Sequence, residues 1–153
     1  MVYSFINFDF YNSKYRDILK IAISNSECFG FFTLKHIRKK DHSDSYFDFL
    51  DRLNNSKISG DKVNPPRYTS GQQFSCYGIN KSTEPVLNEP FDFTAWDGYD
   101  YPEDLVFYKN NKAWLRCISH EKMVLINETN IKALDEIKKL GIDLMQIKDT
   151  NHI

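Results

Sequence analysis

The chain has few of the residues whose spacing identifies a function. It contains only three cysteines in 153 residues, and none of them belongs to a Cys-x-x-Cys pair. An odd number of scattered cysteines argues against a disulfide framework and against a thiolate zinc site of ordinary spacing. Each cysteine lies in an apolar or aromatic stretch, so we expect reduced, buried thiols in a cytosolic protein.

Long hydrophobic runs and a strong charge bias are also missing. No stretch approaches the ~18 apolar residues of a membrane span, and the N-terminus lacks the basic and apolar regions of a signal peptide. The formal net charge is −1, which gives the whole molecule no electrostatic preference for nucleic acid or for acidic membranes. The six glycines form no Walker or dinucleotide-binding motif. The sequence therefore predicts no cofactor, no nucleic-acid partner and a soluble protein.

Aromatic residues, in contrast, are plentiful, with twelve Phe, nine Tyr and two Trp. They supply a substantial core for a chain whose length fits one domain over residues 1–153. Hydrophobic periodicity predicts strands over 2–10, 28–37, 72–79, 105–108, 113–118, 123–126 and 142–147, and helices over about 13–26, 41–53 and 129–140. This pattern predicts an α+β fold, in which a mainly antiparallel sheet packs against two or three helices.

The spacing within these elements predicts which side chains face the core. The inward residues that it predicts in the second helix are Tyr46, Phe47, Leu50 and Leu53. In the third helix one face carries Ile131, Leu134, Ile137 and Leu140. The Lys109-Asn-Asn-Lys112 sequence predicts a tight hairpin turn, since Asn tolerates positive φ. We expect residues 105–126 to form a three-stranded meander at the centre of the fold, with Phe107 and Trp114 facing the core together.

Acidic residues are concentrated in one segment. Residues 1–81 hold twelve Lys or Arg and eight Asp or Glu, a net charge of +4, and residues 109–153 hold eight bases and six acids, a net charge of +2. Residues 82–108 hold seven acids and no base, a net charge of −7. A charge run of this kind is often only a solvated loop.

The same segment interleaves aromatic residues with its carboxylates. Tyr and Trp anchor interfaces, and carboxylates steer a basic partner toward its site. The alternative is that the aromatic rings fill the core and the acids face water. The residues that we predict to bind a protein partner are Trp96, Asp97, Tyr99, Asp100, Tyr101, Glu103 and Asp104.

Histidines give the only candidates for catalysis or metal binding. His36 and His42 lie six residues apart, but no Cys or carboxylate completes a recognisable ligand set, so we expect no metal site. His120 beside Glu121 is the best candidate for a general base, and a structural histidine at a strand end is the alternative. The basic cluster over 35–40 is too short to predict nucleic-acid binding and reads as a solvated strand end.

Several motifs resemble those of a family of small bacterial cytosolic proteins that are often labelled stage III sporulation protein AH. They are Pro102-Glu-Asp-Leu-x-Phe-Tyr108, Trp114-Leu115, Ser119-His-Glu121, Phe5-Ile-Asn-Phe-Asp9 and Cys28-Phe-Gly-Phe-Phe32. The likeness is close over 102–121 and loose over 38–95, and Ser119 stands where the family has Ala. The family has no established catalytic residues, so the resemblance implies none.

The resemblance suggests a class of partner. Proteins of this kind often lie beside secreted polymorphic toxins or in prophage regions, which implies an immunity or antitoxin role. The favoured hypothesis is a non-enzymatic, cytoplasmic immunity protein that binds a basic toxin domain through the acidic segment. The alternatives are a small hydrolase-like enzyme that uses His120 and Glu121, and a prophage-encoded regulator with a protein partner.

Overall fold

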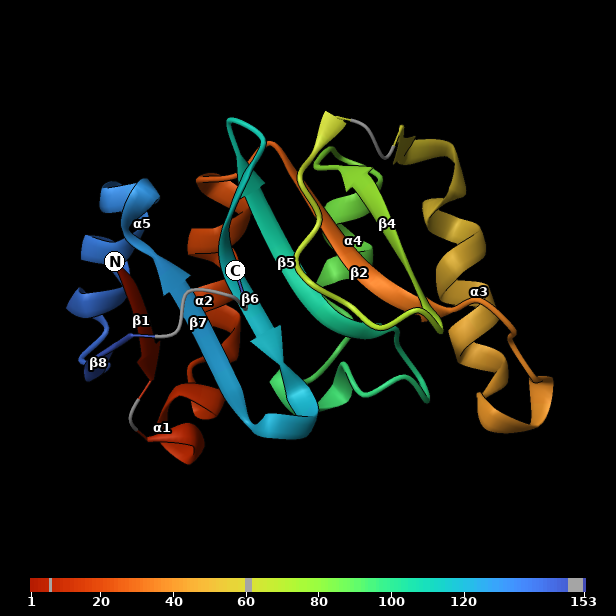
Figure 1. The fold of residues 1–153 in the computed structure, drawn as a ribbon, viewed down its shortest axis with the longest axis horizontal. Coiled ribbons are helices and arrows are strands. Elements are labelled where there is room, and N and C mark those ends of the chain that lie inside the picture. The colour runs from red at the N-terminus through yellow and green to blue at the C-terminus, as the bar shows by residue number, and fades with distance from the viewer. Residues whose placement is uncertain (6, 60–61, 149–152) are drawn as a thin grey trace.

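One antiparallel sheet organises the computed structural model, which describes residues 1–5, 7–59, 62–148 and 153 (Figure 1). The strands of the described chain are β1 Val2–Phe5, β2 Cys28–Leu34, β3 Lys57–Ile58, β4 Gln72–Gly78, β5 Glu103–Lys109, β6 Lys112–Ile118, β7 Met123–Asn127 and β8 Leu144–Ile147. Their order in space is β3, β4, β2, β5, β6, β7, β1 and β8. The sequence-distant β2 and β5 therefore pair at the centre of the sheet.

Helices pack against one face of this sheet. They are α1 Phe8–Ser13, α2 Tyr15–Ser24, α3 Asp44–Leu53, α4 Thr83–Leu87 and α5 Ile131–Lys139. In Figure 1 α2 and α4 lie behind the central strands, with α3 and α5 toward opposite ends of the sheet. Buried residues of α2, α3, α4 and α5 share one hydrophobic core with the sheet. The fold is thus the α+β architecture that the sequence predicts. None of the helices in the described ranges combines the length and the apolar character needed to cross a bilayer.

The central strands are buried on both faces. Alternate residues of β2, Phe29 and Phe31, join the core beneath the helices. Phe32 belongs to a second cluster on the opposite face, which the segment after β3 crosses in Figure 1. At Gly30 an added Cβ would lie 2.2 Å from Cζ of Phe74, so only glycine fits between these strands. Burial on both faces explains why β2 is almost continuously apolar.

The predicted central meander is confirmed. Strands β5, β6 and β7 are consecutive neighbours in the sheet, and Phe107 and Trp114 lie in the same core. Asn110 and Asn111 form the first turn with φ of 49° and 62°, in the left-handed region that Asn tolerates. The predicted final edge strand is also confirmed as β8, at the end of the sheet.

Other predictions of element length and register were wrong. The first strand ends at Phe5 instead of Phe10, because its partner β8 begins opposite Phe5 and offers no further pairing; residues 8–13 form α1. In α3 Tyr46 and Leu53 are buried as predicted, but the third buried residue is Phe49, while Phe47 and Leu50 are only half-buried. In α5 Ile131 is 66% exposed. The position at which each helix meets the sheet decides which of its residues are buried. The spacing of apolar residues alone does not determine that position.

Trp114 should be essential to this core. Its side chain is fully buried, and its Nε1 donates a hydrogen bond of 2.8 Å to Ser26 Oγ. We expect Trp114→Ala to lower the free energy of unfolding by about 3–5 kcal/mol, because it leaves a large cavity. Denaturant titration measures this change, with the exposed Met145→Ala as a control that should shift it by less than about 0.5 kcal/mol. Equal effects of the two substitutions would contradict the packing described above.

Candidate functional site

The acidic segment runs from α4 into β5, beyond one end of the central strands (Figure 1). A short 3-10 turn, Phe93–Ala95, carries it into the core. The carbonyl oxygen of Trp96 accepts a hydrogen bond from Asp104 N, and an isolated antiparallel bridge joins Asp97 to Glu103. Residues 97–103, which we name the acidic loop, therefore leave the core and return to it at almost the same point.

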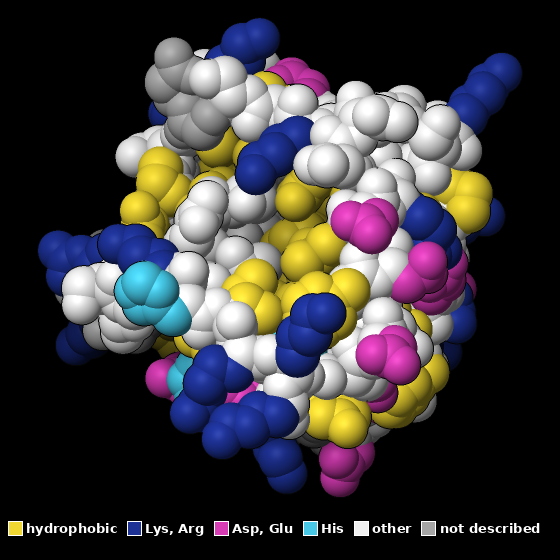
Figure 2. Space-filling model, turned by 90° about the vertical axis from the view of Figure 1, so that its right-hand side faces the viewer, with side chains coloured by type: hydrophobic (Ala, Val, Ile, Leu, Met, Phe, Trp, Pro, Cys, Tyr) yellow, Lys and Arg dark blue, Asp and Glu magenta, His cyan; other side chains and the backbone are white. Residues whose placement is uncertain are grey.

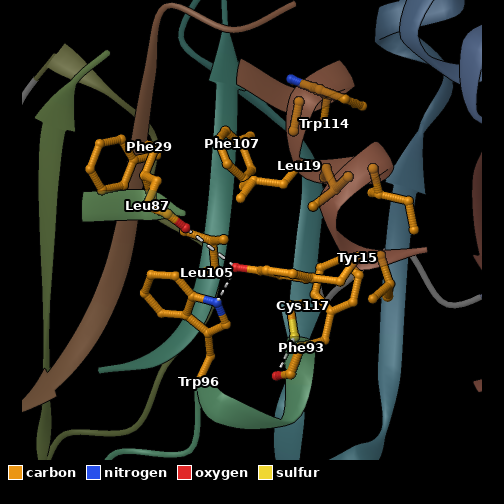
Figure 3. Packing of buried hydrophobic residues seen from close by; sticks show 14 of the residues in the cluster. Tyr15, Leu19, Phe29, Leu87, Phe93, Trp96, Leu105, Phe107, Trp114 and Cys117 are labelled. Carbon is orange, nitrogen blue, oxygen red and sulfur yellow. Dashed lines mark hydrogen bonds between the residues drawn. The ribbon is translucent and has the colours of Figure 1, made fainter. Parts of the chain in front are cut away.

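Trp96 lies inside the molecule. Its side chain has no exposed surface, and its Nε1 donates a hydrogen bond of 3.1 Å to the hydroxyl of Tyr15 (Figure 3). The ring also meets Phe49 at 5.8 Å between centroids. The prediction that Trp96 itself contacts a partner is therefore corrected, because a buried indole fixes the loop from below. Tyr101 is half-buried and packs edge-on against Phe49 at 5.2 Å.

Asp104 is also buried and belongs to the framework. Its carboxylate is 3.0 Å from Nη2 of Arg116, and both side chains are more than nine-tenths buried. Asp104 also accepts a hydrogen bond from the backbone N–H of Ser119. The Arg116 guanidinium lies 5.3 Å from the ring centroid of Phe32. The predicted contact role of Asp104 is corrected for the same reason as that of Trp96.

The other predicted residues stand on the surface or at its edge. Asp97, Tyr99 and Asp100 are exposed, and Glu103 is half-buried. Tyr99 is 55% exposed, although its backbone is held at both ends. Its N–H donates to Asp97 Oδ1 at 3.0 Å, and its carbonyl accepts from Ser43 N at 3.1 Å. The acidic loop thus presents one aromatic ring between two carboxylates on a backbone with fixed turns.

The acidic loop meets the predicted basic cluster, although the two are about sixty residues apart in sequence. Residues 35–40 are exposed, and Lys and Arg side chains gather at the lower left of Figure 2, which views this side of the molecule. Between this turn and the acidic loop lies a cavity of about 320 Å³, which we name the loop cavity. Its lining comprises Phe32, Leu34, Arg38, Asp41, His42, Tyr46, Asp97, Gly98, Tyr99 and Glu103.

His42 is a mostly buried polar residue in the lining of the loop cavity. It is 9% exposed, and its ring stacks on Tyr46 with centroids 4.1 Å apart. His42 Nδ1 lies 2.5 Å from the carbonyl oxygen of Gly98. A carbonyl can only accept, so Nδ1 carries a proton and donates this hydrogen bond. Among the described residues, Nε2 is buried and has no hydrogen-bond partner.

The electrostatic balance of the loop cavity is negative. Arg38 Nε lies 2.5 Å from Asp41 Oδ2, so these two opposite charges offset each other. Glu103 accepts a hydrogen bond of 2.9 Å from Gln72 Nε2, and no base offsets Asp97 among the lining residues. Burial, and after it the negative charge of Glu103, raises the pKa of Tyr46 to about 12.

Sequence reasoning did not find His42 as a site residue. It was considered only as one of a possible metal pair with His36, which is exposed. The contact of His42 with Gly98 joins residues 56 apart, and no local pattern encodes such a contact. In the described ranges no group of three His, Cys, Asp or Glu residues is placed to hold a metal ion. The three cysteines are free and buried, the state that the sequence predicts for their side chains.

His120 and Glu121 occupy an exposed turn after β6. The side chain of His120 is 72% exposed, and its Nε2 lies 3.7 Å from Glu121 Oε1, longer than a hydrogen bond. Water screens an exposed pair of this kind. The geometry therefore gives the enzymatic alternative no buried, oriented base at this position.

Gly98 should be required for the shape of the acidic loop. Its φ is +90°, and an added Cβ would lie 3.0 Å from Glu103 Cγ. We expect Gly98→Ala to lower the free energy of unfolding by more than about 1 kcal/mol, because alanine is strained at positive φ. Gly71→Ala is the matched control, since nothing lies within 4 Å of an added Cβ there. Denaturant titration of both variants tests this, and a neutral Gly98→Ala would show that the loop is not held in this turn.

Removing one partner of the buried ion pair between Asp104 and Arg116 should lower the free energy of unfolding. Arg116→Met leaves a buried, unpaired carboxylate, so we expect a loss of about 3–5 kcal/mol in the free energy of unfolding. Adding Asp104→Asn to that variant removes the uncompensated charge and should restore at least about 1 kcal/mol. A double variant whose loss equals the sum of the two single losses would contradict a direct interaction.

Comparison of the chain with protein-family models, with curated proteins and with solved structures gives no match. What the molecule does is therefore inferred from its own surface and cavity.

Proposed function

We propose that this protein is a non-enzymatic binding protein whose acidic loop captures a basic protein partner. The observation that carries the proposal is the preorganised display of Tyr99 between Asp97 and Asp100. Tyr99 is 55% exposed, while its N–H and its carbonyl are both hydrogen-bonded within the molecule. A large exposed aromatic ring on a fixed backbone is typical of an interface anchor.

Preorganisation favours tight binding. A loop that is ordered before binding loses little conformational entropy when a partner arrives. The buried Trp96 and Asp104 hold the two ends of the acidic loop, so Asp97, Tyr99 and Asp100 keep their positions in the free protein.

The charge of the acidic loop supports a basic partner. The exposed carboxylates of the loop belong to a segment with seven acids and no base, so a positively charged surface is attracted over a distance and associates faster. Together with the resemblance to toxin-associated proteins, this favours a cytoplasmic immunity protein that covers a basic toxin domain. Such domains carry positive charge where they hold nucleic-acid phosphates, and a carboxylate-rich loop can occupy that surface.

The proposal is tested by capturing the partner and measuring its toxicity. We expect affinity-tagged chain, expressed in cells of its source organism, to retain a basic protein that arrests bacterial growth when it is expressed alone. Co-expression of the chain should restore growth. A captured partner that is harmless alone, or that remains toxic beside the chain, would overturn the immunity role.

Substitutions in the acidic loop then separate steering from anchoring. Asp97→Asn with Asp100→Asn should slow association by about tenfold at low salt and reduce its salt dependence, because the steering charge is removed. Tyr99→Ala should mainly speed dissociation. The control is Asp135→Asn, an exposed acid on α5 that should change neither rate. Surface plasmon resonance at several salt concentrations measures both rates, and unchanged rates in all loop variants would place the interface elsewhere.

A further inference from the structure

We infer that the open edge of β4 is a docking site for an extended peptide segment of a protein partner, which adds a strand to the sheet beside α3. This inference goes beyond the proposed function, because it uses no residue of the acidic loop. A groove of about 170 Å³ lies between α3 and β4 at that end of the sheet (Figure 1). We name it the edge groove, and its lining includes Ile37, Leu50, Asp51, Lys57, Gln73 and Ser75.

The hydrogen bonds between β2 and β4 show which backbone groups of β4 face the open edge. Lys35 N donates to Gly71 O, and Ile79 N donates to Glu27 O. Both bonds join directly opposite residues, in line with the register of the two strands. In an antiparallel ladder, residues that bond to a neighbouring strand alternate with residues whose N–H and C=O point away from it. The odd-numbered residues of β4 therefore bond to β2, and the even-numbered residues face the opposite side.

Strand β3 covers only part of that edge. It has two residues, of which Ile58 lies opposite Cys76. Phe74 is the next residue of β4 whose N–H and C=O point outward, and neither group has a hydrogen-bond partner among the described residues. Phe74 is half-buried, and the neighbouring Gln73 is exposed. A strand edge with a free donor and a free acceptor is a template for an added strand.

An added strand that continues the line of β3 would place alternate side chains in the edge groove. Lys57 of β3 and its cross-strand partner Tyr77 both line this groove. Opposite residues share one face of a sheet, and side chains alternate along a strand. The residues opposite Ser75 and Gln73 would therefore point into the groove. The residue between them would exchange two backbone hydrogen bonds with Phe74.

The walls of the edge groove are open to such a segment. Ile37 is 41% exposed, and Leu50 is half-buried. An aliphatic side chain of the partner would cover both residues and remove their apolar surface from water. The incomplete burial of Leu50 is thus consistent with a helix face that a partner completes.

The helix wall of the edge groove complements a positive charge. Asp51 is exposed, and the adjacent Arg52 is paired with Asp48 and Glu89. Asp51 itself has no ion-pair partner in the part of the chain that the structure describes. A lysine or arginine of the partner segment supplies the missing charge.

The position of Lys57 sets the order of the two side chains. Lys57 precedes the place opposite Ser75 along the line of β3, so a base at that place would meet a like charge. The place opposite Gln73 is two residues farther from Lys57. The segment that fits the edge groove therefore carries an aliphatic residue opposite Ser75 and a base opposite Gln73.

Hydrogen exchange in the isolated protein tests the open edge first. We expect the amide of Phe74 to exchange faster than the amides of Gln73 and Ser75, which bond to β2. Equal protection of these three amides would overturn the inference, because the edge would already be covered. Sedimentation of the same sample would then show whether a second copy covers it.

A short peptide then tests binding. Acetyl-Ile-Thr-Lys-Thr-amide is titrated into ¹⁵N-labelled protein, and we expect a saturable shift of the Phe74 amide together with slower exchange of its proton. The matched control carries an N-methyl group on the first Thr, which removes the donor to Phe74 O. It should bind about tenfold more weakly. A peptide with Glu in place of Lys should also bind more weakly, because it meets Asp51 with a like charge.

Variants of the groove test its walls. Asp51→Asn should weaken binding of the lysine peptide by about two- to fivefold, the range for an exposed ion pair. Ile37→Lys should weaken it further, because it removes apolar surface and adds a like charge. The control is Asp44→Asn, an exposed acid on the same helix that does not line the edge groove and should not change binding.

The outcomes separate this inference from the proposed function. No saturable shift at Phe74, or equal binding of the N-methylated peptide, overturns the docking site. Binding that is weakened by N-methylation and by Asp51→Asn supports it. Asp97→Asn with Asp100→Asn should leave peptide binding unchanged, so the failure of either proposal leaves the other standing.

Discussion

The surface of this protein depends on how the acidic loop is closed at its buried ends. The hydrogen bond from Asp104 N to Trp96 O joins the first and last residues of the excursion. Below it the indole of Trp96 is fixed in the core by Tyr15, and the carboxylate of Asp104 is fixed by Arg116. A charged, solvated segment would otherwise sample many conformations. Because both ends are fixed in the core, the segment becomes a surface with defined positions for its side chains.

The same closure forms one candidate binding site from two segments, and neither segment alone predicts such a site. The acidic loop alone is a run of carboxylates, and the turn over 35–40 alone is a run of bases. Two hydrogen bonds hold them together. The Gly98 carbonyl accepts one from His42 Nδ1, and the Tyr99 carbonyl accepts the other from Ser43 N. These contacts bring the acidic loop and the residues before α3 together around the loop cavity.

The binding hypothesis also accounts for the chemistry of the site. Asp97 and Asp100 are exposed, where solvation keeps a carboxylate charged and able to steer. The buried ionisable groups at the base, Asp104 and Arg116, neutralise each other and serve the shape of the loop. His120 and Glu121 lie in the exposed turn after β6, without the burial that orients a catalytic base. Under the binding hypothesis, function rests on shape and charge at one end of the sheet.

The sequence alone determined the local features. Alternating apolar residues predicted the central meander, Asn110 and Asn111 predicted its turn, and the aromatic content predicted a large core. Each depends on neighbours a few residues apart, which the order of amino acids states directly. The sequence also located the acidic segment and named Asp97, Tyr99 and Asp100, because their charge and ring chemistry are properties of the residues themselves.

Only the tertiary structure decided which members of that segment are buried. Trp96 and Asp104 have the same chemistry as their exposed neighbours, and their burial follows from the core beneath them and from Arg116 on the adjacent strand. The end of β1 at Phe5 follows from the length of β8, and the role of His42 follows from a contact across 56 residues. Burial and long-range pairing are set by the packing of the whole chain, so no local pattern in the sequence carries them.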